Sequence, residues 1–274
     1  MAGPQAGRLM GAGLGRSLRA EWTKLRTLPS TAWLLLGIAA LTIAVSAAAA
    51  APVDTGNCPS PAECFEDTVK VSLSGVRVGQ TVAVVLAALV ICGEYGGTLR
   101  TTLAAQPRRL LVLLAKAGVL AAAVAVAGTV GVAGSLAAGH LILPANGFTP
   151  AHGYPAFALT DTTMLRAALG TVLYLVLVAL LSLGVATALR DTAGSITTVL
   201  GLLFTAPILT LVMTDPEWKE RVERFTPMNA GLAIQATRHL ERLPIGPWTG
   251  LGVLALYTAG ALLLGTLSFI KRDQ

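Results

Sequence analysis

The chain has 274 residues, of which 54% are hydrophobic and only 12% are charged, and its mean hydropathy is +0.70. So few charged residues cannot cover the surface of a soluble globular domain, and we expect an all-α integral membrane protein in contact with a lipid bilayer. The net charge of +6 does not indicate a nucleic-acid partner, because basic residues gather beside membrane helices on the cytoplasmic side.

Residues 1–30 are expected to form a cytoplasmic leader ahead of the first membrane span. Between Leu14 and Leu28, apolar residues recur at helical spacing, while the charged residues occupy other positions. This pattern predicts an amphipathic interfacial helix that lies in the headgroup plane. The alternative is a solvated leader without a role.

Residues 31–274 are expected to form one transmembrane domain. A helix needs about 20 mostly apolar residues to cross about 30 Å of hydrocarbon. Six stretches meet this requirement, at residues 31–51, 76–92, 117–139, 164–189, 193–213 and 248–270.

Six spans place the N and C termini on the same side of the membrane. The basic flank of the first span predicts that this side is cytoplasmic, because Lys and Arg set the orientation of membrane proteins. Twelve of the 20 Lys and Arg residues are then cytoplasmic, and the other eight lie outside, five of them in the loop before the last span.

The first span ends in a small-residue run, from Ser46 to Pro52, that imitates a signal-peptide cleavage site. Its basic leader is about 30 residues long and its apolar run exceeds the usual length of about 7 to 15 residues, so we expect the span to be retained. In the polar loop that follows, Cys58 and Cys64 face the oxidising side, and the sequence leaves a disulfide between them open.

The third apolar run, from Leu110 to Leu143, is too long for one perpendicular span and contains Lys116. We therefore expect its first turns to lie in the interface. Small residues recur at four-residue spacing along its uncharged part, which favours close approach of another helix or reflects only the abundance of Ala and Gly. These residues are Ala127, Gly131, Ser135 and Gly139.

A turn and a helix kink are expected in the second half of the chain. A tight turn is expected at Arg190 and Asp191, and Pro207 is expected to kink the fifth span. The loop from Thr214 to Pro247 mixes charges of both signs, and its weakly apolar middle, Met228 to Ala236, is suited to dip into the interface.

The sequence offers no set of catalytic or metal-binding residues. It contains no G-x-x-x-x-G-K-[ST] phosphate loop, and His140, His152 and His239 lack partners at metal-ligand spacing. The central thirds of the spans hold no ionisable residue, which argues against a transporter driven by a coupling ion. We therefore expect a protein that is not an enzyme and that binds no cofactor or metal itself.

The most distinctive polar stretch runs from Gly93 to Lys116, between the second and third spans. Glu94 marks the exit from the membrane, two glycines then break the helix, Thr98 can cap a short helix, and Pro107 ends it. A rigid short helix between two spans can move both of them when it is pushed. The alternative is an ordinary basic cytoplasmic loop.

Three stretches carry a family resemblance, GEYGGTLRTTLAAQPRRLLVLLAK, RAEWTKLRTLPSTAW and RFTPMNAGLAI. In this order and spacing they resemble the bacterial type-2 ABC transporter (ABC-2) permeases, especially the actinobacterial ones, over nearly the whole chain. Gly96 and Gly97 depart from the family, in which a polar residue often precedes the glycine. The resemblance implies six helices per subunit, a pore formed by two subunits, and an ATPase supplied as a separate chain.

The resemblance also implies roles for particular residues. The segment from Glu94 to Gln106 would be the coupling helix that docks on the ATPase, and the ATPase-coupling residues would be Glu94, Tyr95, Thr98, Leu99, Arg100, Thr101, Thr102, Leu103, Pro107, Arg108 and Arg109. The leader would be the interfacial connecting helix, with Glu21, Trp22, Lys24 and Arg26. The segment from Pro227 to Ile234 would be an external re-entrant hairpin, with Pro227, Asn229 and Gly231.

We therefore expect the permease subunit of an ATP-driven exporter in a bacterial plasma membrane. A dimer of ATPase subunits would bind ATP and Mg²⁺, and a second permease copy would complete the pore. The alternatives are a secondary transporter and a non-transporting membrane scaffold or immunity subunit. The uncharged interior weakly favours an apolar or amphipathic cargo.

Overall fold

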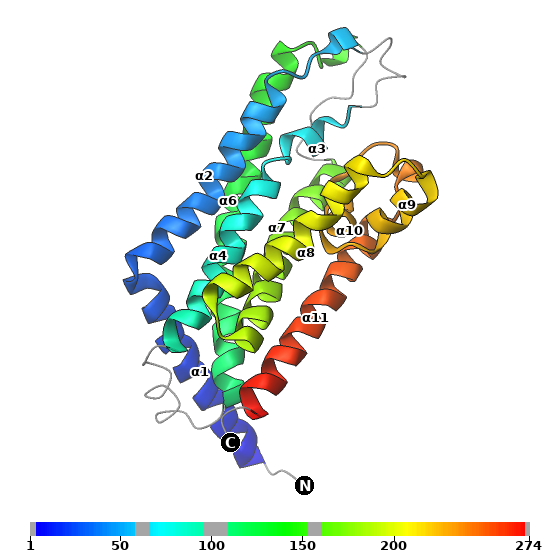
Figure 1. The fold of residues 1–274 in the computed structure, drawn as a ribbon. Helices are drawn as coiled ribbons and strands as arrows, with labels where there is room; N and C mark the ends of the chain where they lie inside the picture. The colour runs from blue at the N-terminus through cyan, green and yellow to red at the C-terminus, as the bar shows by residue number, and fades with distance from the viewer. Residues whose placement is uncertain (1–3, 58–65, 96–108, 153–160, 272–274) are drawn as a thin grey trace.

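The computed structural model describes residues 4–57, 66–95, 109–152 and 161–271. These residues are 87% helical and include no strand. Six of their helices are long and apolar enough to cross a membrane, as the sequence predicted, and they lie side by side with a common tilt (Figure 1). They are α2 (Pro29–Ala50), α4 (Val76–Tyr95), α6 (Arg109–Ala145), α7 (Thr162–Leu189), α8 (Thr192–Val212) and α11 (Pro247–Lys271).

The shorter elements gather at the two ends of this bundle. Helix α1 (Pro4–Thr27) and the last turn of α11 lie at one end, which we call the α1 end (Figure 1). At the opposite end, called the α10 end, the connections contain η1 (Thr55–Asn57), α3 (Thr68–Ser72), η2 (Pro150–His152), α9 (Pro216–Phe225), α10 (Pro227–Leu232), η3 (Ala233–Gln235) and η4 (Leu240–Arg242).

Helix α7 forms the centre of the bundle. It contacts α4, α6, α8 and α11, and Tyr174, Leu175 and Val178 in its middle are fully buried. A helix that is apolar on all sides has no face for water, so it is stable only where other helices or lipid surround it. The main hydrophobic core therefore follows α7.

Glycines set the closest helix contacts. A Cβ atom at Gly184 of α7 would lie 2.6 Å from the backbone carbonyl carbon of Ala261 in α11, so only glycine fits there. In α6, a Cβ atom at Gly131 would lie 3.3 Å from Ala39 Cα of α2, and one at Gly139 would lie 2.0 Å from Ser72 Oγ of α3. The close approach predicted for the small-residue stripe of α6 is therefore confirmed at both glycines.

Aspartates fix the starts of several helices. Asp67, Asp161, Asp191 and Asp215 each accept a backbone N–H bond in the first turn of α3, α7, α8 and α9, respectively. Arg190 between α7 and α8 adopts the left-handed conformation with φ of 61°, which confirms the predicted tight turn. These caps satisfy backbone donors that a helix start leaves without partners.

Helices α6 and α8 each continue past a proline, and a segment expected to be a loop contains a short helix. The 37 residues of α6 form one continuous helix of roughly 55 Å that includes Lys116 and continues past Pro144, so it is longer than the hydrocarbon layer. Helix α8 continues through Pro207 to Val212. The loop expected between residues 52 and 75 contains helix α3, because Asp67 caps a short run with a buried apolar side.

Candidate functional site

The predicted ATPase-coupling segment connects α4 to α6 at the α1 end. Glu94 and Tyr95 form the last residues of α4, and Arg109 is the first residue of α6. The predicted residues that lie outside the described residues are Thr98, Leu99, Arg100, Thr101, Thr102, Leu103, Pro107 and Arg108. The structure thus positions the two helices that this segment joins.

A buried ion pair lies beside these helix ends. Lys116 Nζ of α6 is 2.7 Å from Glu21 Oε2 of α1, and the two residues are only 2% and 5% exposed. Lys116 Nζ also donates to the backbone carbonyl of Val90 in α4, at 3.3 Å. The second carboxylate oxygen of Glu21 accepts from Lys24 Nζ at 3.0 Å. One ammonium group therefore joins α1, α4 and α6.

Apolar contacts surround the ion pair. Leu25 of α1 is buried against Val119 and Ala123 of α6, and Leu18 packs beside them. This packing keeps water from Lys116 and Glu21, so the electrostatic interaction is screened little. The arrangement fixes the position of α1 on the bundle.

The predicted interfacial residues of α1 do not share one environment. Trp22 and Arg26 are exposed, Lys24 is half-buried, and Glu21 faces the bundle. The sequence pattern set Glu21 apart from the apolar positions of α1, and in the structure its carboxylate is buried against Lys116. Two features of the sequence could have indicated this ion pair. Glu21 is the only acid before Asp54, and Lys116 is the only Lys or Arg between Leu110 and Leu143.

A second polar contact lies in the middle of the bundle. The hydroxyl of Tyr174 in α7 donates to Gln80 Oε1 of α4, and Gln80 Nε2 donates to Met228 Sδ of α10 at 3.4 Å. Tyr174 and Gln80 are 0% exposed. Nearer the α1 end, Ser182 Oγ donates to the carbonyl of Val84 at 2.9 Å. The contact between Gln80 and Tyr174 could not be predicted from the sequence, because neither residue carries a charge and neither stands out in an apolar span.

The predicted re-entrant segment packs tightly into the α10 end. Pro227 and Gly231 are buried and Asn229 is half-buried. A Cβ atom at Gly231 would lie 2.7 Å from the Tyr174 ring, so α10 rests directly on the centre of the bundle. A Cβ atom at Gly250 of α11 would lie 2.1 Å from the Ala230 carbonyl oxygen.

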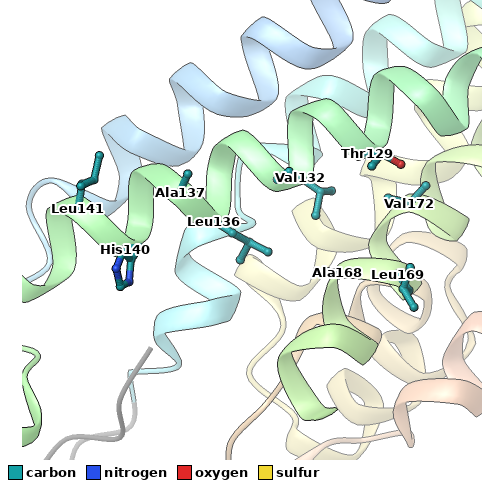
Figure 2. Close-up of a pocket in the computed structure, with 10 residues that line it drawn as sticks. Thr129, Val132, Leu136, Ala137, His140, Leu141, Ala168, Leu169 and Val172 are labelled. Carbon is teal, nitrogen blue, oxygen red and sulfur yellow. The ribbon is translucent and has the colours of Figure 1, made fainter. Parts of the chain in front are cut away.

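An apolar groove separates α6 from α7 on the outer surface. It has a volume of about 430 Å³. Figure 2 shows Val132 and Leu136 of α6 and Leu169 and Val172 of α7 along it, with His140 at one end. A second apolar groove, of about 580 Å³, lies between α7, α8 and α11. Both are lined almost entirely by apolar side chains and offer no set of groups for catalysis.

Cys58 and Cys64, the cysteines with an open disulfide assignment, lie outside the described residues. Cys92 near the end of α4 carries a free thiol, whose Sγ donates to the Ala186 carbonyl at 3.9 Å. In the described part of the chain, no group of three His, Cys, Asp or Glu residues lies close enough to hold a metal ion.

Comparison with protein-family models and with curated proteins gives no match for this chain. The family therefore stays an expectation that rests on the residues. The six apolar helices indicate a multi-pass membrane protein.

Proposed function

We propose that the chain is the membrane-spanning permease subunit of an ATP-driven exporter of the type-2 ABC class. The observation that carries this proposal is the contact of α1, α4 and α6 through Glu21, Val90 and Lys116, which we call the joint at the α1 end. The polar, basic segment 96–108 connects α4 to α6. Lys116, eight residues after this segment, donates to the carbonyl of Val90, six residues before it, and pairs with Glu21 of α1. A protein that pushes on this segment acts on three helices at once.

The charge distribution supports a cytoplasmic position for this joint. By sequence, the segments that belong to the α1 end contain twelve of the 20 Lys and Arg residues, and those of the α10 end contain eight. Cytoplasmic segments of membrane proteins are enriched in these residues. An ATPase in the cytoplasm would then reach segment 96–108, and the sequence, which lacks a phosphate loop, would leave the binding of ATP and Mg²⁺ to that partner.

The proposed mechanism couples nucleotide binding to a movement of α4 and α6. Closure of the ATPase dimer on ATP displaces segment 96–108, and the Lys116 contacts make α1, α4 and α6 move together. This movement changes the packing of α4 on α7, where Gln80 meets Tyr174. Two permease copies would enclose the pore, which then alternates between inward and outward access. The central thirds of the spans carry no charged residue, which weakly favours an apolar or amphipathic cargo.

The test is purification of the native complex and measurement of its ATPase activity. A phosphate-loop ATPase of roughly 30 kDa should copurify with the chain. Arg100→Ala and Leu103→Ala should each lower export and the stimulation of the ATPase by the permease, while membrane insertion stays normal. Lys219→Ala, which removes an exposed cation at the α10 end, is the control and should change neither.

The two alternatives give different results in the same experiment. Transport that follows a proton gradient and continues after ATP depletion would identify a secondary transporter. A chain that copurifies with no ATPase and transports nothing would be a scaffold or an immunity subunit. Full export by both segment variants, with normal ATPase stimulation, would contradict the coupling role of residues 96–108.

A further inference from the structure

A cationic pocket opens at the α10 end, away from the joint at α1. It has a volume of about 400 Å³, within the size range of small-ligand sites. Two walls form it: one contains α3 and the first turn of α4, and the other contains the η3 to η4 segment. Four basic side chains line these walls, Lys70, Arg77, Arg238 and Arg242.

Asp67 holds the two walls together. Its carboxylate accepts from the Thr237 hydroxyl at 2.7 Å, from the Thr237 backbone N–H at 2.5 Å and from the Arg238 backbone N–H at 3.0 Å, and it also caps α3 at Lys70. Gln235 Nε2 adds a bond to the Leu73 carbonyl at 3.4 Å. The pocket is therefore formed before a ligand arrives, which lowers the entropic cost of binding.

The described residues that line the pocket carry more positive than negative charge. Two carboxylates, Glu66 and Asp67, line it beside the four basic side chains, and the oxygens of Asp67 are occupied by the wall contacts. Among the described residues, neither Lys70 nor Arg77 forms an ion pair. Ser74 Oγ, which also lines the pocket, is buried without a hydrogen-bond partner there.

A third acid, Glu241, lies beside the pocket and offsets part of the charge of two lining residues, His239 and Arg242. Glu241 lies beside His239, with Nδ1 to Oε1 at 3.5 Å. The pKa of the Glu241 carboxyl lies below its ordinary value, first because of its own backbone N–H and then because of His239 and Arg242. Glu241 is exposed and does not line the pocket, whereas His239 and Arg242 do.

We propose that this pocket binds the phosphate group of a ligand with net negative charge. Guanidinium groups match the geometry of phosphate oxygens, an ammonium group adds a point charge, and the Ser74 hydroxyl can donate a further bond. Arg77 is the second residue of α4, which places the pocket beside the end of an apolar span. The phosphate therefore belongs either to an anionic lipid headgroup or to a free phosphate compound. The site does not depend on the proposed transport function.

Binding to the purified chain, reconstituted in phosphatidylcholine nanodiscs, tests the site. One arm replaces part of the phosphatidylcholine with phosphatidylglycerol and counts retained lipid by native mass spectrometry. The other arm titrates pyrophosphate by calorimetry. The double substitution Lys70→Gln and Arg77→Gln should lower the affinity for whichever probe binds, phosphatidylglycerol or pyrophosphate, by roughly tenfold or more. This is the effect expected for the loss of charged hydrogen bonds.

The matched control removes two cations from α9, at the same end of the bundle. Lys219→Gln with Arg224→Gln has the same change in net charge and lies outside the pocket, so it should leave binding unchanged. A response to phosphatidylglycerol identifies a lipid headgroup, and a response to pyrophosphate identifies a soluble ligand. The proposal is overturned if wild-type protein binds neither probe, or if the two double variants lose binding equally.

Discussion

Lys116 illustrates how a single charge can decide the arrangement of three helices. Its ammonium group contacts the Glu21 carboxylate at 2.7 Å and the Val90 carbonyl at 3.3 Å in a place that water does not reach. Removing two charges from water is costly, so such a pair is a weak guide to net stability. Removal of one partner should lower the stability of the protein, because it leaves the other charge buried without compensation.

The first prediction is that Lys116→Met destabilises the protein by about 3 to 5 kcal/mol. The double variant Glu21→Leu with Lys116→Met should recover much of this loss, because it removes both buried charges, and Lys24 is exposed enough to reach water. The measurement is the unfolding of purified protein in detergent. Lys271→Met, an exposed lysine at the same end, is the control. Equal stability of the single variant and wild type would show that the ion pair does not form.

The second prediction concerns the buried hydroxyl of Tyr174. Tyr174→Phe leaves Gln80 Oε1 without its donor in the middle of the bundle, at an expected cost of about 1 to 3 kcal/mol. Tyr257→Phe removes a hydroxyl that reaches the Phe225 carbonyl at 3.3 Å near the surface, and should change stability by less than about 0.5 kcal/mol. The same unfolding assay compares them, and similar stability losses would contradict the role given to Gln80.

At the level of elements, the distance between helices depends on where glycine replaces a side chain. Helices α7 and α11 meet at Gly184 and Gly265, where a Cβ atom on either residue would lie within 2.6 Å of backbone atoms of the opposite helix. In a membrane, packing of this kind contributes strongly to helix association, because lipid tails are as apolar as the helices. The α7 and α11 pair is therefore sensitive to a single added methyl group.

The third prediction is that Gly184→Ala destabilises the protein by about 1 to 3 kcal/mol, since the two backbones must move apart. Gly260→Ala in α11 is the matched control, because a Cβ atom there meets nothing within 4 Å. It should leave the unfolding temperature unchanged or raise it slightly, as alanine favours the helix. A stable Gly184→Ala protein would mean that α7 and α11 lie further apart than described.

For the whole molecule, the six long helices place α1 and the end of α11 at the same end of the bundle. The larger number of Lys and Arg residues at this end assigns it to the cytoplasm under the proposed function. The same assignment puts the cationic pocket outside the cell. The orientation therefore decides which partners each end can meet.

The fourth prediction tests this orientation by cysteine labelling in intact cells. In a background with Cys58, Cys64 and Cys92 replaced by serine, a membrane-impermeant maleimide should label Glu220→Cys of α9. It should label Arg19→Cys of α1 only after the cells are opened. Both positions are exposed in the structure, so access to the reagent depends on the side of the membrane. The reverse labelling pattern would invert the protein and exclude a cytoplasmic ATPase at the α1 end.

The sequence by itself determined the class of protein and the number of long apolar helices. These properties depend on local composition: about 20 apolar residues in a row suit a helix in a bilayer whatever surrounds them. The turn at Arg190 and the small-residue stripe of α6 could also be predicted from the sequence, because turn-forming residues and four-residue spacing are local properties as well.

Only the tertiary structure decided which residues meet. Glu21 and Lys116 are 95 residues apart in the sequence. Asp67 and Thr237, which join the two walls of the cationic pocket, are 170 residues apart. A sequence gives no spatial distance between such positions. The joint of α1, α4 and α6 and the contact between Gln80 and Tyr174 arose in the same way. Each depends on how the helices pack, because a buried polar group is tolerated only where a partner from another helix reaches it.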